Sequence, residues 1–197
     1  MTRIIAGKHG GRRLQTLPGA ATRPTTDRVK EAVFSALESR LGSLHGFRVL
    51  DLYAGSGALG IEALSRGAAE VVFCESQSRA VSVIRANLRS LGATATIWTA
   101  PAERALAERA LAERTLATAK GEPFDLVLAD PPYPLSDDAV ADFLTQLGRG
   151  WLAEGATVVL ERSARSVEPT WPTGMQPSGV KTYGETRIWY LNYEEKK

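Results

Sequence analysis

The 197-residue chain contains one cysteine and two histidines, and aromatic residues make up only 7% of it. A single cysteine, Cys74, excludes an internal disulfide framework. Two distant histidines, His9 and His45, do not supply the ligands of a structural zinc site. No apolar run approaches the ~20 residues that a membrane-spanning helix needs, and the N-terminus lacks the apolar stretch of a signal peptide. We therefore expect a cytoplasmic protein with no metal site and no membrane partner.

The composition is that of an ordinary globular protein, with 44% hydrophobic and 23% charged residues. The length allows one domain with a small appendage and a full hydrophobic core. We expect this domain to span residues 23–197 and to follow a basic β-hairpin extension over residues 1–22. We also expect the protein to be a monomer.

The formal net charge is only +2, but the charges are unevenly distributed. Residues 31–197 sum to −4, whereas residues 1–30 hold a single acidic residue and the seven basic residues Arg3, Lys8, Arg12, Arg13, Arg23, Arg28 and Lys30. Such a basic segment is typical of a surface that binds nucleic acid, although a solvated surface without a partner is the alternative. The first six of these residues are the candidate nucleic-acid contacts.

Strands and helices alternate along most of the chain, which predicts an α/β fold with a doubly wound, mostly parallel, seven-stranded sheet. The predicted parallel strands cover residues 47–53, 71–75, 94–99, 124–130 and 157–161. The predicted helices cover residues 27–41, 58–66, 78–91 and 137–147, and helix propensity alone adds one within 102–117.

Two further segments have the pattern of β-hairpins. Residues 180–183 and 187–193 flank Gly184 with no helix between them, which predicts an antiparallel hairpin at the edge of the sheet. Residues 4–16 place a Gly-rich centre between two short extended runs, which predicts the basic hairpin at the N-terminus.

A glycine-rich loop follows the first predicted parallel strand. Gly55, Gly57 and Gly60 form the pattern G-x-G-x-x-G between a strand and a helix, where the missing side chains let a ligand approach the backbone. Glu75, 20 residues beyond Gly55, ends the next strand, where an acid accepts both hydroxyls of a ribose. This pattern fits a nicotinamide dinucleotide as well as S-adenosylmethionine (SAM).

Asp51 helps to distinguish these two ligands. Its carboxylate, four residues before Gly55, would repel a pyrophosphate but attract the α-amino group of SAM, directly or through water. The alternative is a simple helix-capping role for Asp51, to which we give less weight. SAM is therefore the expected cofactor.

The tetrapeptide Asp130-Pro131-Pro132-Tyr133 follows the fourth predicted parallel strand. Two consecutive prolines lack N–H groups, so the local carbonyls are left as acceptors. The Asp130 carboxylate and a neighbouring carbonyl can accept both hydrogens of an exocyclic amine and thereby aim its lone pair at a methyl donor. Tyr133 can stack on the base. The alternative is a proline-rich turn without a catalytic role.

Two more segments narrow the identification. Arg23-Pro-Thr-Thr-Asp-Arg-Val-Lys-Glu31 precedes the first predicted helix, and Tyr183-Gly184-Glu-Thr-Arg-Ile lies near the C-terminus. With the basic hairpin, the glycine-rich loop and Asp-Pro-Pro-Tyr, they make nearly the whole chain resemble the RsmD family of class I SAM-dependent methyltransferases. The resemblance implies methylation of N2 of one guanine in small-subunit 16S rRNA, free or in the small ribosomal subunit. Asp-Pro-Pro-Tyr alone is shared with adenine and cytosine amino-methyltransferases and indicates only the reaction.

The resemblance also implies roles for individual residues. The catalytic residues would be Asp130, Pro131, Pro132 and Tyr133. The cofactor-binding residues would be Asp51, Tyr53, Ala54, Gly55, Ser56, Gly57, Glu75, Ala102 and Thr26. Thr25, Thr26 and Asp27 would close over the cofactor. Related enzymes often place an acid against the adenine amino group, but Pro101 stands at that position here. Either the Ala102 backbone or the Glu103 carboxylate would take its place.

Three other functions remain open at this point. An amino-methyltransferase acting on DNA or on another RNA would keep every catalytic residue. A nicotinamide-dependent oxidoreductase would use the glycines and Glu75 but leave Asp51 and Asp130 without a role. A non-catalytic RNA-binding assembly factor would use the basic segment alone.

Overall fold

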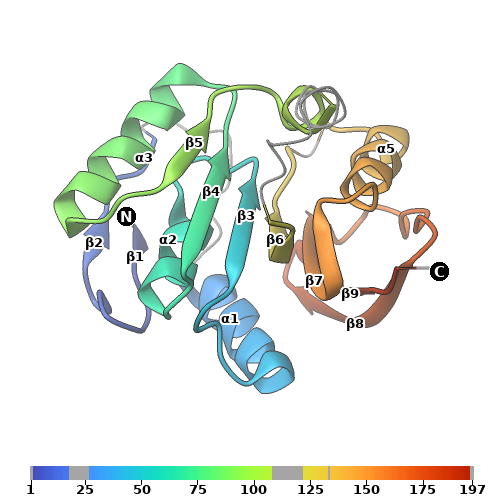
Figure 1. Cartoon of the computed structure of the whole chain (residues 1–197), viewed down its shortest axis with the longest axis horizontal. Coiled ribbons are helices and arrows are strands. Elements are labelled where there is room, and N and C mark those ends of the chain that lie inside the picture. Colours follow the sequence, from blue (N-terminus) through green and yellow to red (C-terminus); the bar gives the residue numbers. More distant parts are fainter. Residues whose placement is uncertain (1, 18–26, 108–121, 133, 196–197) are drawn as a thin grey trace.

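The computed structural model describes residues 2–17, 27–107, 122–132 and 134–195. Its centre is a seven-stranded sheet with the strand order β5-β4-β3-β6-β7-β9-β8 (Figure 1). The parallel strands are β3 (Arg48–Leu52), β4 (Glu70–Cys74), β5 (Thr96–Trp98), β6 (Phe124–Ala129) and β7 (Leu152–Ser163). The antiparallel strands β9 (Thr186–Tyr193) and β8 (Met175–Tyr183) complete the sheet. The predicted doubly wound sheet with its C-terminal hairpin is confirmed.

Helices cover both faces of the sheet, because alternate strand residues point to opposite sides. Leu50 and Leu52 pack against residues 102–107 and α5 (Asp137–Leu147), whereas Val49 packs against α1 (Asp27–Leu41), α2 (Ala58–Ser65) and α3 (Ser78–Leu91). Cys74 is buried in the first of these two cores, as expected. The remaining residues of the predicted helix within 102–117 lie outside the described residues from 108 onwards.

Two strands are longer than predicted. β7 begins at Leu152, five residues early, because its pairing with β6 continues past a register shift near Phe124. β8 begins at Met175, also five residues early, and another register shift interrupts it between Pro177 and Gly179. Most β8 side chains are exposed at the sheet edge, so the sequence there shows no alternating apolar pattern.

The N-terminal hairpin packs closely against the domain. Its two-residue strands β1 (Thr2–Arg3) and β2 (Arg13–Leu14) pair antiparallel, and Leu14 is buried among residues of α1, α2 and α3. A Cβ atom added at Gly7 would lie 1.8 Å from the carbonyl oxygen of Ser65 on α2. Only glycine fits this close contact, so the hairpin and α2 pack as one unit.

Lys30 on α1 does not contribute to the basic surface that the sequence predicts. Its side chain is 0% exposed, and its Nζ donates to the Thr2 hydroxyl at 3.2 Å and to the Arg3 carbonyl at 2.5 Å. It also forms an ion pair with Asp27 at 3.6 Å. Burial lowers the pKa of Lys30, although Glu62 and Asp27 oppose this shift. Counting Lys30 as a surface cation was therefore wrong, since it fastens the hairpin to α1.

Candidate active site

Three of the predicted site residues come together at the carboxyl ends of adjacent parallel strands. Asp51 lies in β3, Glu75 directly follows β4 and Asp130 directly follows β6. The strand order reverses between β3 and β6, and open α/β sheets bind their ligands at such a point. Burial raises the pKa of Asp51 well above its ordinary range, and the charges of Asp130 and Glu75 add to this shift. The site therefore concentrates carboxyl groups.

The glycine-rich loop is shaped by Asp51. One carboxylate oxygen of Asp51 accepts a hydrogen bond from the Gly60 amide at 2.8 Å, and the Asp51 side chain is only 1% exposed. This is the helix-capping contact to which the sequence interpretation gave less weight. Gly57, with φ of +79°, allows the chain to turn into α2. Asp51 thus acts on the shape of the loop, whatever further contact it makes with a ligand.

Gly60→Ala is expected to destabilise the protein by about 1–3 kcal/mol, because the added methyl overpacks the core. Its Cβ would lie 2.4 Å from the Phe73 ring and 2.9 Å from the Asp51 carboxylate. The displaced loop should also weaken SAM binding. Thermal unfolding and a SAM titration would measure both effects. Gly148→Ala is the control, since its Cβ would meet nothing closer than 3.6 Å; equal behaviour of the two variants would contradict the prediction.

Glu75 is buried, at 8% exposure, and holds the loop from the neighbouring strand. One of its carboxylate oxygens accepts from the Gly55 amide at 2.8 Å and the other from the Gln77 amide at 2.7 Å. Each carboxylate oxygen has a second acceptor position. Glu75 can therefore keep both backbone contacts and still accept two ribose hydroxyls.

Tyr53 links the loop to the segment after β5. It has φ of +59°, which is unusual for a residue with a side chain, and such strain gathers at functional sites. Its hydroxyl donates to Glu103 at 2.6 Å, and burial raises the pKa of Tyr53, so the donor stays protonated. Glu103 is thus engaged by Tyr53, and Ala102 is buried at 3% exposure. Which of the two meets an adenine ring stays a prediction.

The segment after β6 presents Asp130 at intermediate exposure, with Pro131 buried and Pro132 exposed. The Pro132 carbonyl accepts from the Leu135 amide at 2.9 Å. The sequence predicted that the local carbonyls remain as acceptors, but the Pro132 carbonyl is engaged in a turn. Among the described residues, no donor contacts the Pro131 carbonyl. Tyr133 lies outside the described residues, as do Thr25 and Thr26.

Arg162, near the end of β7, supports this turn and was missed from the sequence. Its side chain is 5% exposed, and its guanidinium donates to the Leu135 carbonyl at 3.1 Å and to Asp137 at 2.7 Å. The available signal was a charged pair, Glu161 and Arg162, that interrupts an apolar strand. An arginine buried there holds the segment that follows Asp-Pro-Pro-Tyr.

Five basic side chains of the N-terminal segment lie on the surface. Arg3 forms an exposed ion pair with Asp27 at 3.8 Å. The other exposed members of the predicted set are Lys8, Arg12, Arg13 and Arg28, and Arg23 lies outside the described residues. Among the described residues, no group of His, Cys, Asp or Glu could hold a metal ion. Within the same residues, no helix is long and apolar enough to cross a membrane.

The fold and these residues define a class I SAM-dependent methyltransferase, and comparison with known proteins agrees. The model of the family described as "Conserved hypothetical protein 95" matches residues 2–192. The "Ribosomal RNA small subunit methyltransferase D" of Escherichia coli K12 is 33% identical over 186 residues, which are 93% of this chain and 85% of that protein. The chain therefore belongs to this family, the RsmD family of rRNA methyltransferases.

Two further relatives are similar over nearly their whole length. The "Putative rRNA methyltransferase YlbH" of Bacillus subtilis is 35% identical over 190 residues, or 94% of this chain and 96% of that protein. The solved structure of the "Putative methyltransferase yhhF from Escherichia coli" has a TM-score of 0.81 and 30% identity, and covers 98% of this chain and 97% of its own. The protein is thus a SAM-dependent rRNA methyltransferase, and the nicotinamide alternative was wrong.

The residues present fit SAM. Its sulfonium and ammonium groups are cationic, and the site offers the carboxyl groups of Asp51, Glu75 and Asp130. Its ribose needs two acceptors, which Glu75 retains. Gly60 leaves no room for a side chain and Gly57 little, because both pack against the core, whereas Gly55 has no neighbour closer than 4.0 Å and leaves its backbone open to a ligand. A nucleoside without phosphates suits such an acidic pocket.

SAM affinity is expected to increase with pH above the ordinary range of aspartate pKa values. Burial and the neighbouring carboxylates raise the pKa of Asp51 in the free protein, whereas a bound cation favours the ionised carboxylate and lowers this pKa. Binding should therefore release protons. Titration calorimetry in buffers of different ionisation enthalpy would measure that release. Asp51→Asn should abolish it, and identical proton release by this variant would contradict the prediction.

Proposed function

We propose that the protein transfers the methyl group of SAM to the exocyclic N2 amine of one guanine in small-subunit 16S rRNA. The observation that carries the proposal is the position of Asp130, half-buried directly after β6, the strand that pairs with β3, which holds the buried Asp51. An acceptor for the amine therefore stands beside the carboxylates that suit SAM. The relatives named as small-subunit rRNA methyltransferases support the choice of rRNA.

The cofactor site would be built from the loop and the two strands beside it. Asp51 and the backbone of the loop would hold the methionine part, and Glu75 the ribose. We assign the site to Asp51, Tyr53, Ala54, Gly55, Ser56, Gly57, Glu75, Ala102 and Thr26. When bound, SAM supplies a methyl group activated by its sulfonium.

The chain's own residues would then position the amine. The Asp130 carboxylate and the Pro131 carbonyl accept one hydrogen each, which directs the nitrogen lone pair toward the methyl carbon. The proton need not leave first, because the amine loses it as the new bond forms. Tyr133 would stack on the base, which has to leave its own stack to reach the site. Pro132 and Arg162 would act only through the shape of this segment.

The RNA would meet the basic side of the molecule. We assign this contact to Arg3, Lys8, Arg12, Arg13, Arg23 and Arg28, and we propose that the hairpin of residues 1–22 serves the domain of residues 23–197 in this way. Guanidinium groups bind phosphate oxygens in a bidentate manner, which favours arginine for this role. The small ribosomal subunit would be the partner, and the protein would act as a cytoplasmic monomer.

Incubation with labelled SAM tests the proposal on three substrates: naked 16S rRNA, small subunits purified from cells that lack the enzyme, and duplex DNA. The expected product is N2-methylguanosine in the RNA, which mass spectrometry of digested rRNA would identify and map. An amine in DNA or in another RNA is the second candidate, because Asp-Pro-Pro-Tyr serves either. Label in DNA alone, or on a base other than guanine, would contradict the proposal.

A further inference from the structure

Helix α3 carries three arginines and no acidic residue along its 14 residues. Arg79, Arg85 and Arg89 are all exposed, whereas the opposite face of the helix is buried against the sheet. The charge distribution of the sequence predicted a basic surface only in residues 1–30, which do not include this helix. Its positive charge has no partner of opposite sign on the same element.

The arrangement of these charges favours the helix only at Arg89, which lies in the last turn, where the helix dipole stabilises a cation. Arg85 and Arg89 are four residues apart, so their like charges lie next to each other on one face, about 6 Å apart along the axis, and repel. Arg79 lies in the first turn, where the helix dipole disfavours a cation. Local rules are commonly broken at functional sites. A bound polyanion would offset the repulsion between these arginines and be attracted by their combined positive charge.

The N-terminal segment runs along the last turns of α3. The Arg12 guanidinium donates to the Ser90 carbonyl at 3.3 Å. Three residues further on, the Gln15 amide donates to the Asn87 side chain at 2.8 Å, and the Asn87 amide donates back to the Gln15 carbonyl at 3.1 Å. Arg12 is therefore held against the last turn of the helix, which also carries Arg89.

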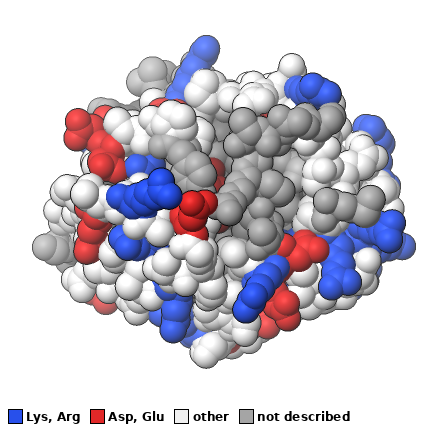
Figure 2. Space-filling model, turned by 180° about the vertical axis from the view of Figure 1, so that it is seen from behind, with Lys and Arg blue, Asp and Glu red and all other residues white. Residues whose placement is uncertain are grey.

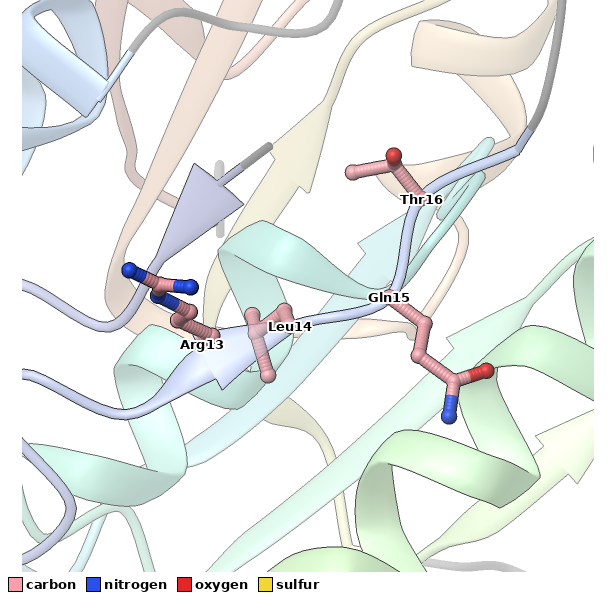
Figure 3. Close-up of a pocket in the computed structure, with 4 residues that line it drawn as sticks. All are labelled: Arg13, Leu14, Gln15 and Thr16. Carbon is pink, nitrogen blue, oxygen red and sulfur yellow. The ribbon is translucent and has the colours of Figure 1, made fainter.

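A hollow lies at residues 13–16 of the N-terminal segment. Arg13, Leu14, Gln15 and Thr16 line the hollow, and the side chains of Arg13 and Gln15 point away from each other (Figure 3). Basic side chains gather along the right-hand edge of the face in Figure 2. This is the side of the molecule on which β1 and β2 lie, at the left of Figure 1.

Asn87 also connects this surface to the cofactor loop. Its side chain is 1% exposed, and its amide donates to the Ser56 carbonyl at 3.1 Å in addition to Gln15. A single buried side chain thus holds residue 15 of the basic segment and residue 56 of the glycine-rich loop. The position of one is set relative to the other.

We propose that Arg12, Arg85 and Arg89 form one tract that binds the phosphates of the rRNA substrate, and that Asn87 fixes this tract relative to the glycine-rich loop. The proposal rests on the proposed function for the identity of the RNA. It extends the predicted basic segment onto the exposed face of α3. The guanidinium groups of the tract bind phosphate without reading sequence.

The test is RNA binding by the full-length protein as a function of salt concentration, with transcribed 16S rRNA as the probe. The double variant Arg85→Gln, Arg89→Gln should bind about tenfold more weakly at low salt. The slope of log K against log salt should fall by about two, one for each lost phosphate contact. The control is Arg149→Gln, Lys181→Gln, which removes two exposed charges elsewhere and should leave affinity and slope unchanged.

Three outcomes would overturn the tract: a slope equal to that of the parent protein, an equal loss in the control, or tighter binding to duplex DNA of the same length. Asn87→Leu should raise the KM for RNA and weaken SAM binding together, and an effect on neither would overturn the role of Asn87. These experiments also distinguish failure of the proposed function from failure of the tract. If guanine methylation is absent while the slope falls as expected, the tract stands and the function does not.

Discussion

Asp130→Ala is expected to lower kcat for methyl transfer by about 10²–10⁴ while RNA affinity is retained. The carboxylate would accept one hydrogen of the amine, and its loss removes the hydrogen bond that orients the nitrogen lone pair. It also removes the negative charge that stabilises the positive charge developing on the amine nitrogen. Asp130 ends β6 beside Asp51, not in the basic tract. Single-turnover transfer of labelled methyl groups to 16S rRNA, together with an RNA binding isotherm, measures both effects.

The matched control for Asp130 is Asp138→Ala. Asp138 is an exposed acid in the first turn of α5, a few residues further along the same connection. Removing it changes the net charge by the same amount but touches no proposed substrate group. Transfer by the Asp138 variant should remain within about twofold of the parent protein. If the Asp130→Ala variant transfers methyl groups at the parental rate, Asp130 has no role in the mechanism.

Glu62→Ala is expected to destabilise the fold by about 3–5 kcal/mol, because it breaks a buried ionic network by removing one partner. Glu62 is 0% exposed. Its carboxylate accepts from the amides of Ile5 and Ala6 at 2.7 and 3.0 Å and from Arg66 at 2.8 Å. The variant leaves the buried Lys30 with less compensating negative charge. For a chain of this size, the melting temperature should fall by roughly 6–20 °C.

Calorimetry or thermal circular dichroism would measure the loss, with Glu31→Ala as the control. Glu31 is an exposed acid on α1, and its removal should change the melting temperature by no more than about 2 °C. Because Glu62 binds the backbone of the hairpin, Glu62→Ala should also increase proteolysis within residues 2–17. A melting temperature close to that of the Glu31 variant would contradict the prediction.

Several elements follow the sequence pattern closely. Helices α3 and α5 begin and end where the apolar spacing predicted, and α5 has a capping serine, Ser136, whose hydroxyl accepts from the Ala139 amide at 3.2 Å. The approach of Asp51, Glu75 and Asp130 was predictable too, since each ends or follows a parallel strand, and parallel strands end at one edge of the sheet.

The residues that connect these elements were not predictable in the same way. Glu62, Asn87 and Arg162 lie in helices or strands whose local patterns are ordinary, and their partners are distant in sequence. Glu62 reaches the hairpin across 57 residues, Asn87 reaches Gln15 across 72, and Arg162 reaches Leu135 across 27. No periodicity marks such pairs, because periodicity reports only which side of its own element a residue occupies.

The sequence by itself determined the order of strands and helices, the cofactor class and the position of Asp-Pro-Pro-Tyr, the motif that we propose meets the amine. Apolar periodicity, glycine positions and consecutive prolines determine the conformation of the few residues around them, so they can be interpreted without the tertiary structure. Only the tertiary structure decided that Asp51 caps the glycine-rich loop, that Lys30 is buried, and that the basic segment lies along α3. These three features depend on which polar groups come into contact when separate elements pack. A buried charge or amide needs a hydrogen-bonding partner, and in this protein the partner belongs to another element.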